Sequence, residues 1–272
     1  MRPLRIGIVG CGAIGSHLAR VITEDFSGRA NLVSIYDLDS DKTERLAAEL
    51  GGRIIVEKSA IHLVKRVELV VEAASASVSY EVAKNALTFR KDVMIMSVGG
   101  LMDRADVLFE LAERNNCRIF IPSGAICGID GIKAAGRAGI RTVRLTTYKS
   151  AETFRDVPYV QENNISLDNL RKEKVIFEGS AGEAVKYFPR NVNVAATLSL
   201  AGIGAENTRV RIIATPAQKT NVHEIEIEGE AGRIFVRTEN KTHPDNPKTS
   251  YLAVLSAIET LRGITESVRI GT

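Results

Sequence analysis

The sequence predicts a two-domain protein: an α/β Rossmann-type doubly wound parallel sheet, followed by a second α+β domain. An apolar strand, a glycine-rich turn and an amphipathic helix open the chain in that order. Strand-like and helix-like segments then alternate up to about residue 124, as in a parallel sheet with helical crossovers. From about residue 140 this alternation gives way to strands of alternating polarity. We therefore expect domains at 1–124 and 125–248, with the helix at 249–264 packing back on the first.

The turn between the first strand and the first helix is the clearest motif. The run LRIGIV is continuously apolar, as expected for a strand buried on both faces, and it leads into GCGAIG, which has the spacing G-x-G-x-x-G. The first glycine permits a tight turn, the second lets backbone N–H groups approach a pyrophosphate, and the third allows close packing of helix and strand. The candidate dinucleotide contacts here are Gly10, Gly12, Ala13, Ile14 and Gly15.

An aspartate ends the second strand of this pattern. Asp37 closes the run NLVSIYD, about 20 residues beyond the glycine turn, where an acidic residue can accept hydrogen bonds from ribose hydroxyls. A carboxylate at this place would repel a 2′-phosphate, so the sequence favours NAD, while NADP stays open. The later strand VELVVEAA ends in Ala73, Ala74 and Ser75, small residues where a dinucleotide would cross the strand ends.

The second half has a different pattern. Strands are expected at 142–150, 174–179, 209–216, 223–229 and 233–239, and helices at 180–188 and 191–202. Ser180 and Glu183 have capping-box spacing, and EGEAGR is typical of a hairpin turn. The segment 242–250 is expected to be a Pro/Asn/Asp-rich loop. Strands with helices on one face constitute an α+β layer.

Composition excludes several classes of function. Among 272 residues the net charge is +3 without a long basic run, which argues against a nucleic-acid partner, and no apolar run approaches the roughly 20 residues of a membrane span. Three cysteines show neither metal spacing nor a disulfide framework, so no metal and a cytoplasmic location are expected. Cys127 is expected to be a small buried filler. The early first strand argues against a cleaved signal.

A histidine is the leading candidate for proton transfer. In the stretch TNVHEIEIEG, His223 shares one strand face with two isoleucines, whereas three glutamates occupy the opposite, solvated face. Its ring titrates near neutral pH, although a core histidine with a satisfied hydrogen bond is the alternative. His17 and His62 are expected to be structural or surface residues, and His243 is expected to be exposed in the loop.

The helix at 191–202 offers two asparagines. Asn191 is expected to cap the helix, and Asn193, one turn inside, could contact a nicotinamide carboxamide. Anionic substrate groups would need cationic partners. The candidates by residue type are Lys149, Arg190, Arg209 and Lys248.

At this point the chain resembles the L-aspartate dehydrogenase family. The resemblance rests on GIVGCGAIG, PSGAICGIDGI, FPRNVNVAATLSLAGIG, TRVRIIATP, TNVHEIEIEGEAG and DNPKTS, in order over nearly the whole chain. It implies NAD(P)-dependent oxidation of L-aspartate to iminoaspartate, then oxaloacetate and ammonia, with a role in NAD biosynthesis. It places the family's active-site histidine on His223 and its later nucleotide contacts on Ala125 and Asn193. A homodimer or larger homo-oligomer is expected.

Two alternative functions stay open on the sequence. One is another two-domain NAD(P)-dependent oxidoreductase. Dihydrodipicolinate reductases have a paired-histidine motif that is absent here, and the sugar oxidoreductases have Glu-Lys-Pro where this chain has the stretch SVGG at 97–100. The other is a non-catalytic NAD-sensing module, which would bind the cofactor without turning over an amino acid.

Overall fold

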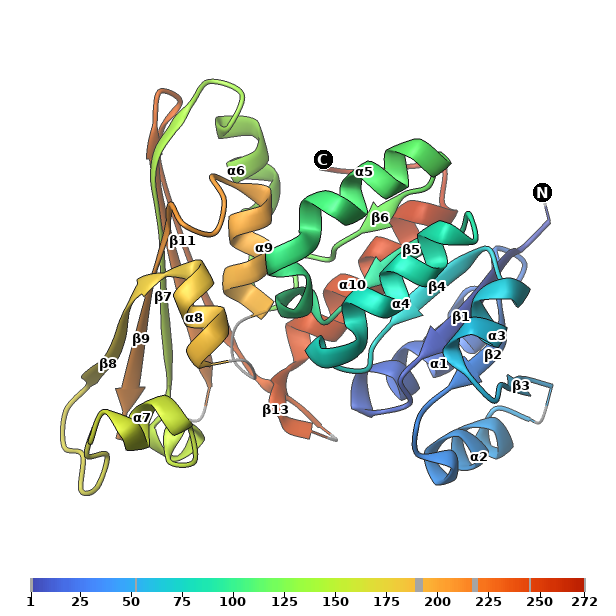
Figure 1. The fold of residues 1–272 in the computed structure, drawn as a ribbon, viewed down its shortest axis with the longest axis horizontal. Coiled ribbons are helices and arrows are strands. Elements are labelled where there is room, and N and C mark those ends of the chain that lie inside the picture. The colour runs from blue at the N-terminus through green and yellow to red at the C-terminus, as the bar shows by residue number, and fades with distance from the viewer. Residues whose placement is uncertain (1, 52, 189–192, 217–219, 245, 272) are drawn as a thin grey trace. The chain divides into compact units, whose positions relative to one another are not determined.

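The chain forms two compact units in a computed structural model that describes residues 2–51, 53–188, 193–216, 220–244 and 246–271 (Figure 1). The first unit comprises the chain up to Pro122 together with Val254–Ile270, and the second comprises Ser123–Ala253. None of the helices among the described residues has the length and apolar character needed to cross a membrane.

Unit 1 is built on a six-stranded parallel sheet in the order β3-β2-β1-β4-β5-β6. Its strands are β1 (Leu4–Val9), β2 (Ala30–Tyr36), β3 (Ile55–Val56), β4 (Leu69–Glu72), β5 (Asp92–Ile95) and β6 (Ile119–Phe120). This is the strand order of a doubly wound Rossmann sheet, which confirms the predicted fold class. The carboxyl ends of β1, β2 and β4 therefore lie side by side, and these are the strands that lead into the candidate cofactor contacts.

Helices cover both faces of this sheet. They are α1 (Ala13–Asp25), α2 (Ser40–Glu49), α3 (Ala60–Arg66), α4 (Ala76–Thr88), α5 (Ala105–Asn115) and the 3₁₀ helix η1 (Val98–Arg104). Helix α10 (Tyr251–Thr265), from the end of the chain, joins this core through Val254, Ala257 and Leu261, which pack with residues of α1 and β1.

Unit 2 contains a five-stranded mixed sheet in the order β11-β10-β7-β9-β8. Its strands are β7 (Ile140–Ser150), β8 (Lys174–Ser180), β9 (Thr208–Thr215), β10 (Asn221–Gly229) and β11 (Gly232–Asn240). The neighbours β7 and β9 are parallel and the other pairs are antiparallel. The predicted hairpin turn is confirmed, since Gly229 pairs with Gly232.

One face of the second sheet packs against helices, as the predicted α+β layer requires. The helices of this unit are α6 (Ile129–Ala135), α7 (Pro158–Glu162), α8 (Ala181–Tyr187), α9 (Asn193–Ala201) and the 3₁₀ helix η2 (Ala151–Phe154). Ile132 of α6, Ala184 of α8 and Leu198 of α9 share one hydrophobic core with the inward residues of the sheet. The predicted capping box at the start of α8 is confirmed.

Three local predictions are wrong. The expected loop at 242–250 is a hairpin of β12 (Thr242–His243) and β13 (Asn246–Ser250), because turn-forming residues mark only its centre while the flanking backbone pairs. His243 is buried rather than exposed, and its ring packs edge-on against Tyr251 with centroids 5.5 Å apart. Cys127 is exposed rather than a buried filler; small size allowed burial, but its loop leaves it at the surface.

Candidate functional site

The glycine turn of unit 1 has the geometry that a dinucleotide requires. A Cβ on Gly10, where φ is +100°, would lie 2.5 Å from the Ala73 carbonyl oxygen, and one on Gly15 would lie 1.8 Å from the Gly10 carbonyl oxygen. Both clashes involve backbone, so neither position tolerates a side chain. A Cβ on Gly12 would meet nothing within 4 Å. The turn is thus close-packed behind and open in front, which is the cradle that a pyrophosphate needs.

The start of α1 presents backbone donors to this open side. Gly12 is the N-cap, and it provides no side-chain hydrogen bond to the helix. Ala13 and Ile14 occupy the first turn, which contains no acidic residue. Because the N-terminal N–H groups of a helix lack intrahelical partners and carry partial positive charge, this end of α1 attracts phosphate.

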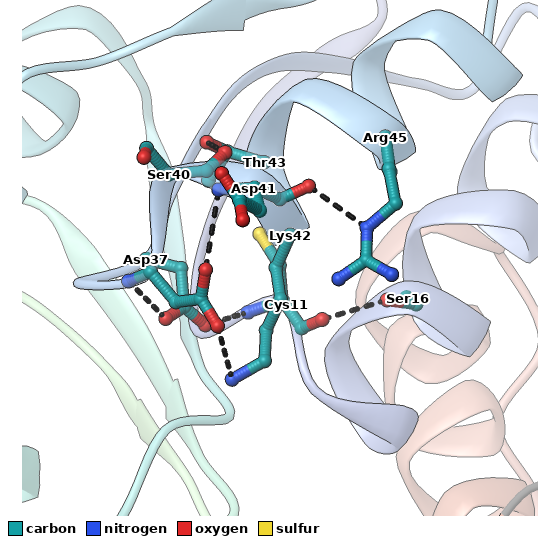
Figure 2. A network of polar contacts seen from close by, with 9 residues as sticks. Cys11, Ser16, Asp37, Ser40, Asp41, Lys42, Thr43 and Arg45 are labelled. Atoms are coloured by element: carbon teal, nitrogen blue, oxygen red, sulfur yellow. Dashed lines mark hydrogen bonds and ion pairs between the residues drawn. The ribbon is translucent and has the colours of Figure 1, made fainter.

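Asp37 follows the end of β2 and reaches the glycine turn (Figure 2). One carboxylate oxygen accepts a hydrogen bond from the backbone N–H of Cys11 at 2.6 Å, and the other accepts one from the N–H of Asp39 at 2.9 Å. Each oxygen has a second lone pair, so the carboxylate can also accept ribose hydroxyls. Asp39 forms an ion pair with Lys42 at 3.2 Å, which offsets its charge. The negative charge of Asp37 disfavours a 2′-phosphate.

The end of β4 contains a residue that sequence reasoning missed. Glu72 is completely buried, and its carboxylate accepts hydrogen bonds from the N–H of Ala74 at 2.8 Å, the N–H of Ser97 at 3.0 Å and the Ser97 hydroxyl at 2.9 Å. Burial raises the pKa of this carboxyl group. The available signal was a single acid within the otherwise apolar run VELVVEAA.

Glu72 positions the segment of the predicted contacts Ala73, Ala74 and Ser75. Ala73 is buried and donates its N–H to the Val9 carbonyl at 2.8 Å, whereas Ala74 and Ser75 are exposed, the latter as N-cap of α4. The structure therefore brings this segment directly against Gly10 at the carboxyl end of the sheet.

In unit 2, His223 lies on the helix-covered face of the sheet and is 3% exposed. It is paired across the sheet with Thr147 of β7 and Thr238 of β11, while the next inward residues of β10, Ile225 and Ile227, belong to the hydrophobic core. Its Nδ1 lies 3.0 Å from Oγ1 of Thr147. The helix-covered face of this sheet is thus apolar around Ile225 and Ile227 and becomes polar at His223.

Burial holds the His223 ring in its neutral form. Loss of hydration, aided by the positive charge of Lys149, lowers the pKa of His223 to about 3. A neutral imidazole can accept a proton, and with Nδ1 engaged by Thr147 the exchange falls to Nε2.

The backbone carbonyl of Ala125 is held by the strand next to His223. It accepts hydrogen bonds from Asn240 Nδ2 at 2.8 Å and from Thr238 Oγ1 at 3.3 Å. Because Thr238 lies opposite His223 in the register, β11 connects the Ala125 segment with the histidine.

Asn193 is exposed and is the first described residue of α9. Its predicted cap, Asn191, lies outside the described residues, as does Arg190.

The structure separates the remaining predicted residues. Lys149 is buried on β7, on the face that His223 occupies, whereas Arg209 is exposed on the opposite face of the sheet. The backbone of Lys248 lies in β13. His17 is half-buried in α1, and His62 is exposed beside the Ser59 cap of α3. Within the described part of the chain, no cluster of three or more His, Cys, Asp or Glu residues could hold a metal ion.

Two family models match the chain, one in each half. The model described as aspartate dehydrogenase, C-terminal, matches residues 130–264. The model described as homoserine dehydrogenase, NAD binding domain, matches residues 10–122 and so includes the glycine turn and Asp37.

Relatives of known function match the full length. The L-aspartate dehydrogenases of Methanococcoides burtonii and Methanosarcina mazei are 46% and 48% identical to this chain, over 99% of it and 100% of their own length. Among solved structures, the aspartate dehydrogenase of Thermotoga maritima is similar with a TM-score of 0.78 and 28% identity, covering 98% of this chain and 99% of that one.

Proposed function

Because this chain belongs to the L-aspartate dehydrogenase family, we propose that it catalyses the reversible oxidative deamination of L-aspartate. In this reaction L-aspartate and NAD(P)⁺ give iminoaspartate, NAD(P)H and a proton, and water then converts iminoaspartate to oxaloacetate and ammonia. The observation that carries the proposal is the buried, neutral His223 at the polar end of the second sheet, within the region that the family's C-terminal model matches.

The residues of unit 1 fit the dinucleotide. The N–H groups at the start of α1 would bind the phosphates above Gly12, and Asp37 would accept the ribose hydroxyls. The segment from Ala73 to Ser75 would line the path of the cofactor across the strand ends. We assign Ala125 and Asn193 of unit 2 to the nicotinamide half. When bound, NAD(P)⁺ supplies the acceptor for the hydride that leaves the substrate Cα.

His223 would perform the proton transfers. The hydrogen bond between Nδ1 and Thr147 orients the ring, so that Nε2 accepts a proton from the substrate ammonium group and later from the water that attacks the imine carbon. A neutral ring is the form that can accept a proton. The pKa of His223 is low in the free protein, so a negative charge that the substrate brings near the ring would make it a stronger base.

The test is NADH formation from NAD⁺ with a panel of amino acids: L-aspartate, D-aspartate, L-glutamate and L-homoserine. Selective turnover of L-aspartate is the expected result. Absence of turnover in both directions, in protein that binds NADH, would contradict the proposal. NADP⁺ is included as a second cofactor, with slower use expected because of Asp37.

Two further parts of the proposal concern the cell. We propose that the protein is a cytoplasmic homodimer or larger homo-oligomer, a state that sedimentation equilibrium of the purified protein would measure. We also propose that it supplies iminoaspartate to NAD biosynthesis.

A further inference from the structure

A buried lysine shares the sheet face of His223. In the antiparallel pair of β7 and β10, Thr147 lies opposite His223, and Lys149 lies two residues further along β7. Side chains two residues apart on a strand point to the same face, so Lys149 and His223 both occupy the polar end of the helix-covered face. Lys149 is 9% exposed. On the strand beyond it, Ala214 is its partner in the register and adds only a methyl group.

The position is costly for a lysine. Loss of hydration lowers the pKa of Lys149 to about 8, so the ammonium group is still charged at neutral pH although it lies in a poorly hydrated place. Stability alone would favour an apolar residue at such a site. A buried charge beside a proton-transfer group is the pattern expected when the charge serves a ligand.

We propose that Lys149 binds one carboxylate of the substrate, and that the polar end of this face is therefore a site for a dicarboxylic amino acid. The inference rests on the proposed function, because it names the residue that selects an acidic substrate. Among the cationic candidates, Lys149 shares the face of His223, whereas Arg209 is exposed on the other face.

The ion pair between Lys149 and the substrate carboxylate would also activate His223. Lys149 is the charged residue whose field lowers the His223 pKa; the groups paired with His223 on β7 and β11, Thr147 and Thr238, are uncharged, and Glu224 points to the opposite face. A carboxylate bound to Lys149 offsets the field of the ammonium group at the ring. Binding of the acidic substrate would thus make His223 a stronger base at the moment when a proton must be accepted.

The test compares Lys149→Met, Lys149→Arg and the exposed control Lys186→Met, each saturated with NADH. Calorimetric titration with succinate, a four-carbon dicarboxylate without an amino group, measures anion binding independently of turnover. Lys149→Met is expected to weaken succinate binding and to raise the KM for L-aspartate roughly 10- to 100-fold, as for loss of one charge-assisted hydrogen bond. Lys149→Arg should recover part of the binding, and Lys186→Met should match the wild type.

Two more readouts separate binding from folding. The far-UV circular dichroism spectrum of Lys149→Met and its Kd for NADH should both match those of the wild type, because the glycine turn and Asp37 belong to unit 1. Without the lysine field, the acid limb of kcat/KM should move to higher pH.

The outcomes distinguish this inference from the proposed function. Succinate binding within twofold of wild type in Lys149→Met, or a wild type that binds no succinate, would overturn the inference. If the wild type oxidises L-aspartate in either case, the proposed function stands without Lys149. A third outcome is that the wild type binds succinate but does not oxidise L-aspartate, and that Lys149→Met no longer binds succinate. In that case the anion site stands and the proposed reaction does not.

Discussion

Thr147 Oγ1 lies 3.0 Å from His223 Nδ1, across the antiparallel pair of β7 and β10. The pair is fixed by strand register rather than by a flexible loop, so the orientation of the ring is a property of the sheet. This hydrogen bond determines which ring nitrogen can exchange a proton.

Removal of the ring should abolish most of the activity. We expect His223→Gln to lower kcat roughly 10²- to 10⁴-fold, because a positioned general base contributes about that much. The Kd for NADH, measured by fluorescence, should stay within about twofold, since the glycine turn and Asp37 belong to unit 1. A fully active His223→Gln variant would exclude the histidine as the base.

Loss of the orienting hydroxyl should have a smaller effect. Thr147→Val keeps the shape of the side chain but removes the hydrogen bond to Nδ1, so kcat should fall roughly 3- to 10-fold, as for one neutral hydrogen bond. Thr147→Ser retains a hydroxyl and should restore activity. Full activity in Thr147→Val would contradict an orienting role of the hydroxyl.

The buried histidine should make stability depend on pH. The pKa of His223 is about 3 in the folded protein and near 6.5 in the unfolded chain. Below pH 6.5 only the unfolded chain binds a proton at this ring, so the free energy of unfolding decreases as the pH falls from 6.5 toward 3. The loss is roughly 1.4 kcal/mol per pH unit in that window. Urea unfolding at pH 7 and pH 4.5 should therefore show a steeper decline for wild type than for His223→Gln. Parallel declines would contradict neutral burial of the ring.

The cofactor preference should respond to Asp37. Replacement by serine removes the negative charge and the acceptor for ribose hydroxyls, so kcat/KM with NAD⁺ should fall while the NADP⁺ to NAD⁺ ratio of kcat/KM rises roughly 10-fold or more. Asp41→Ser, an exposed acid on the following helix, is the matched control. An unchanged ratio in Asp37→Ser would place the specificity elsewhere.

Glu72 should couple stability to cofactor binding. In Glu72→Ala the N–H groups of Ala74 and Ser97 lose their acceptor, the latter in a buried site, which should lower the free energy of unfolding by about 1–3 kcal/mol and raise the KM for NAD⁺. Glu72→Gln retains one acceptor oxygen and should recover part of both. If Glu72→Ala lost stability while its KM for NAD⁺ stayed at the wild-type value, the carboxylate would support the fold alone.

Local patterns determined much of this protein. The apolar run LRIGIV, the spacing of three glycines and the acid after β2 were sufficient for the Rossmann sheet, because backbone geometry requires those residue types at those places. Alternation along TNVHEIEIEG likewise predicted the inward side of His223. Each of these features depends on residues close together in the chain.

Only the tertiary structure decided which distant residues meet. Residue type alone could not distinguish Lys149 from Arg209 as a substrate-binding candidate. The register of the paired strands places Lys149 on the face of His223 and Arg209 on the opposite face. His243 and Cys127 were misplaced for the same reason: burial depends on what other elements cover, as the Tyr251 ring covers His243. The carboxylate of Glu72 accepts hydrogen bonds from Ser97, which follows the neighbouring strand β5, and the linear sequence does not show that these two residues meet.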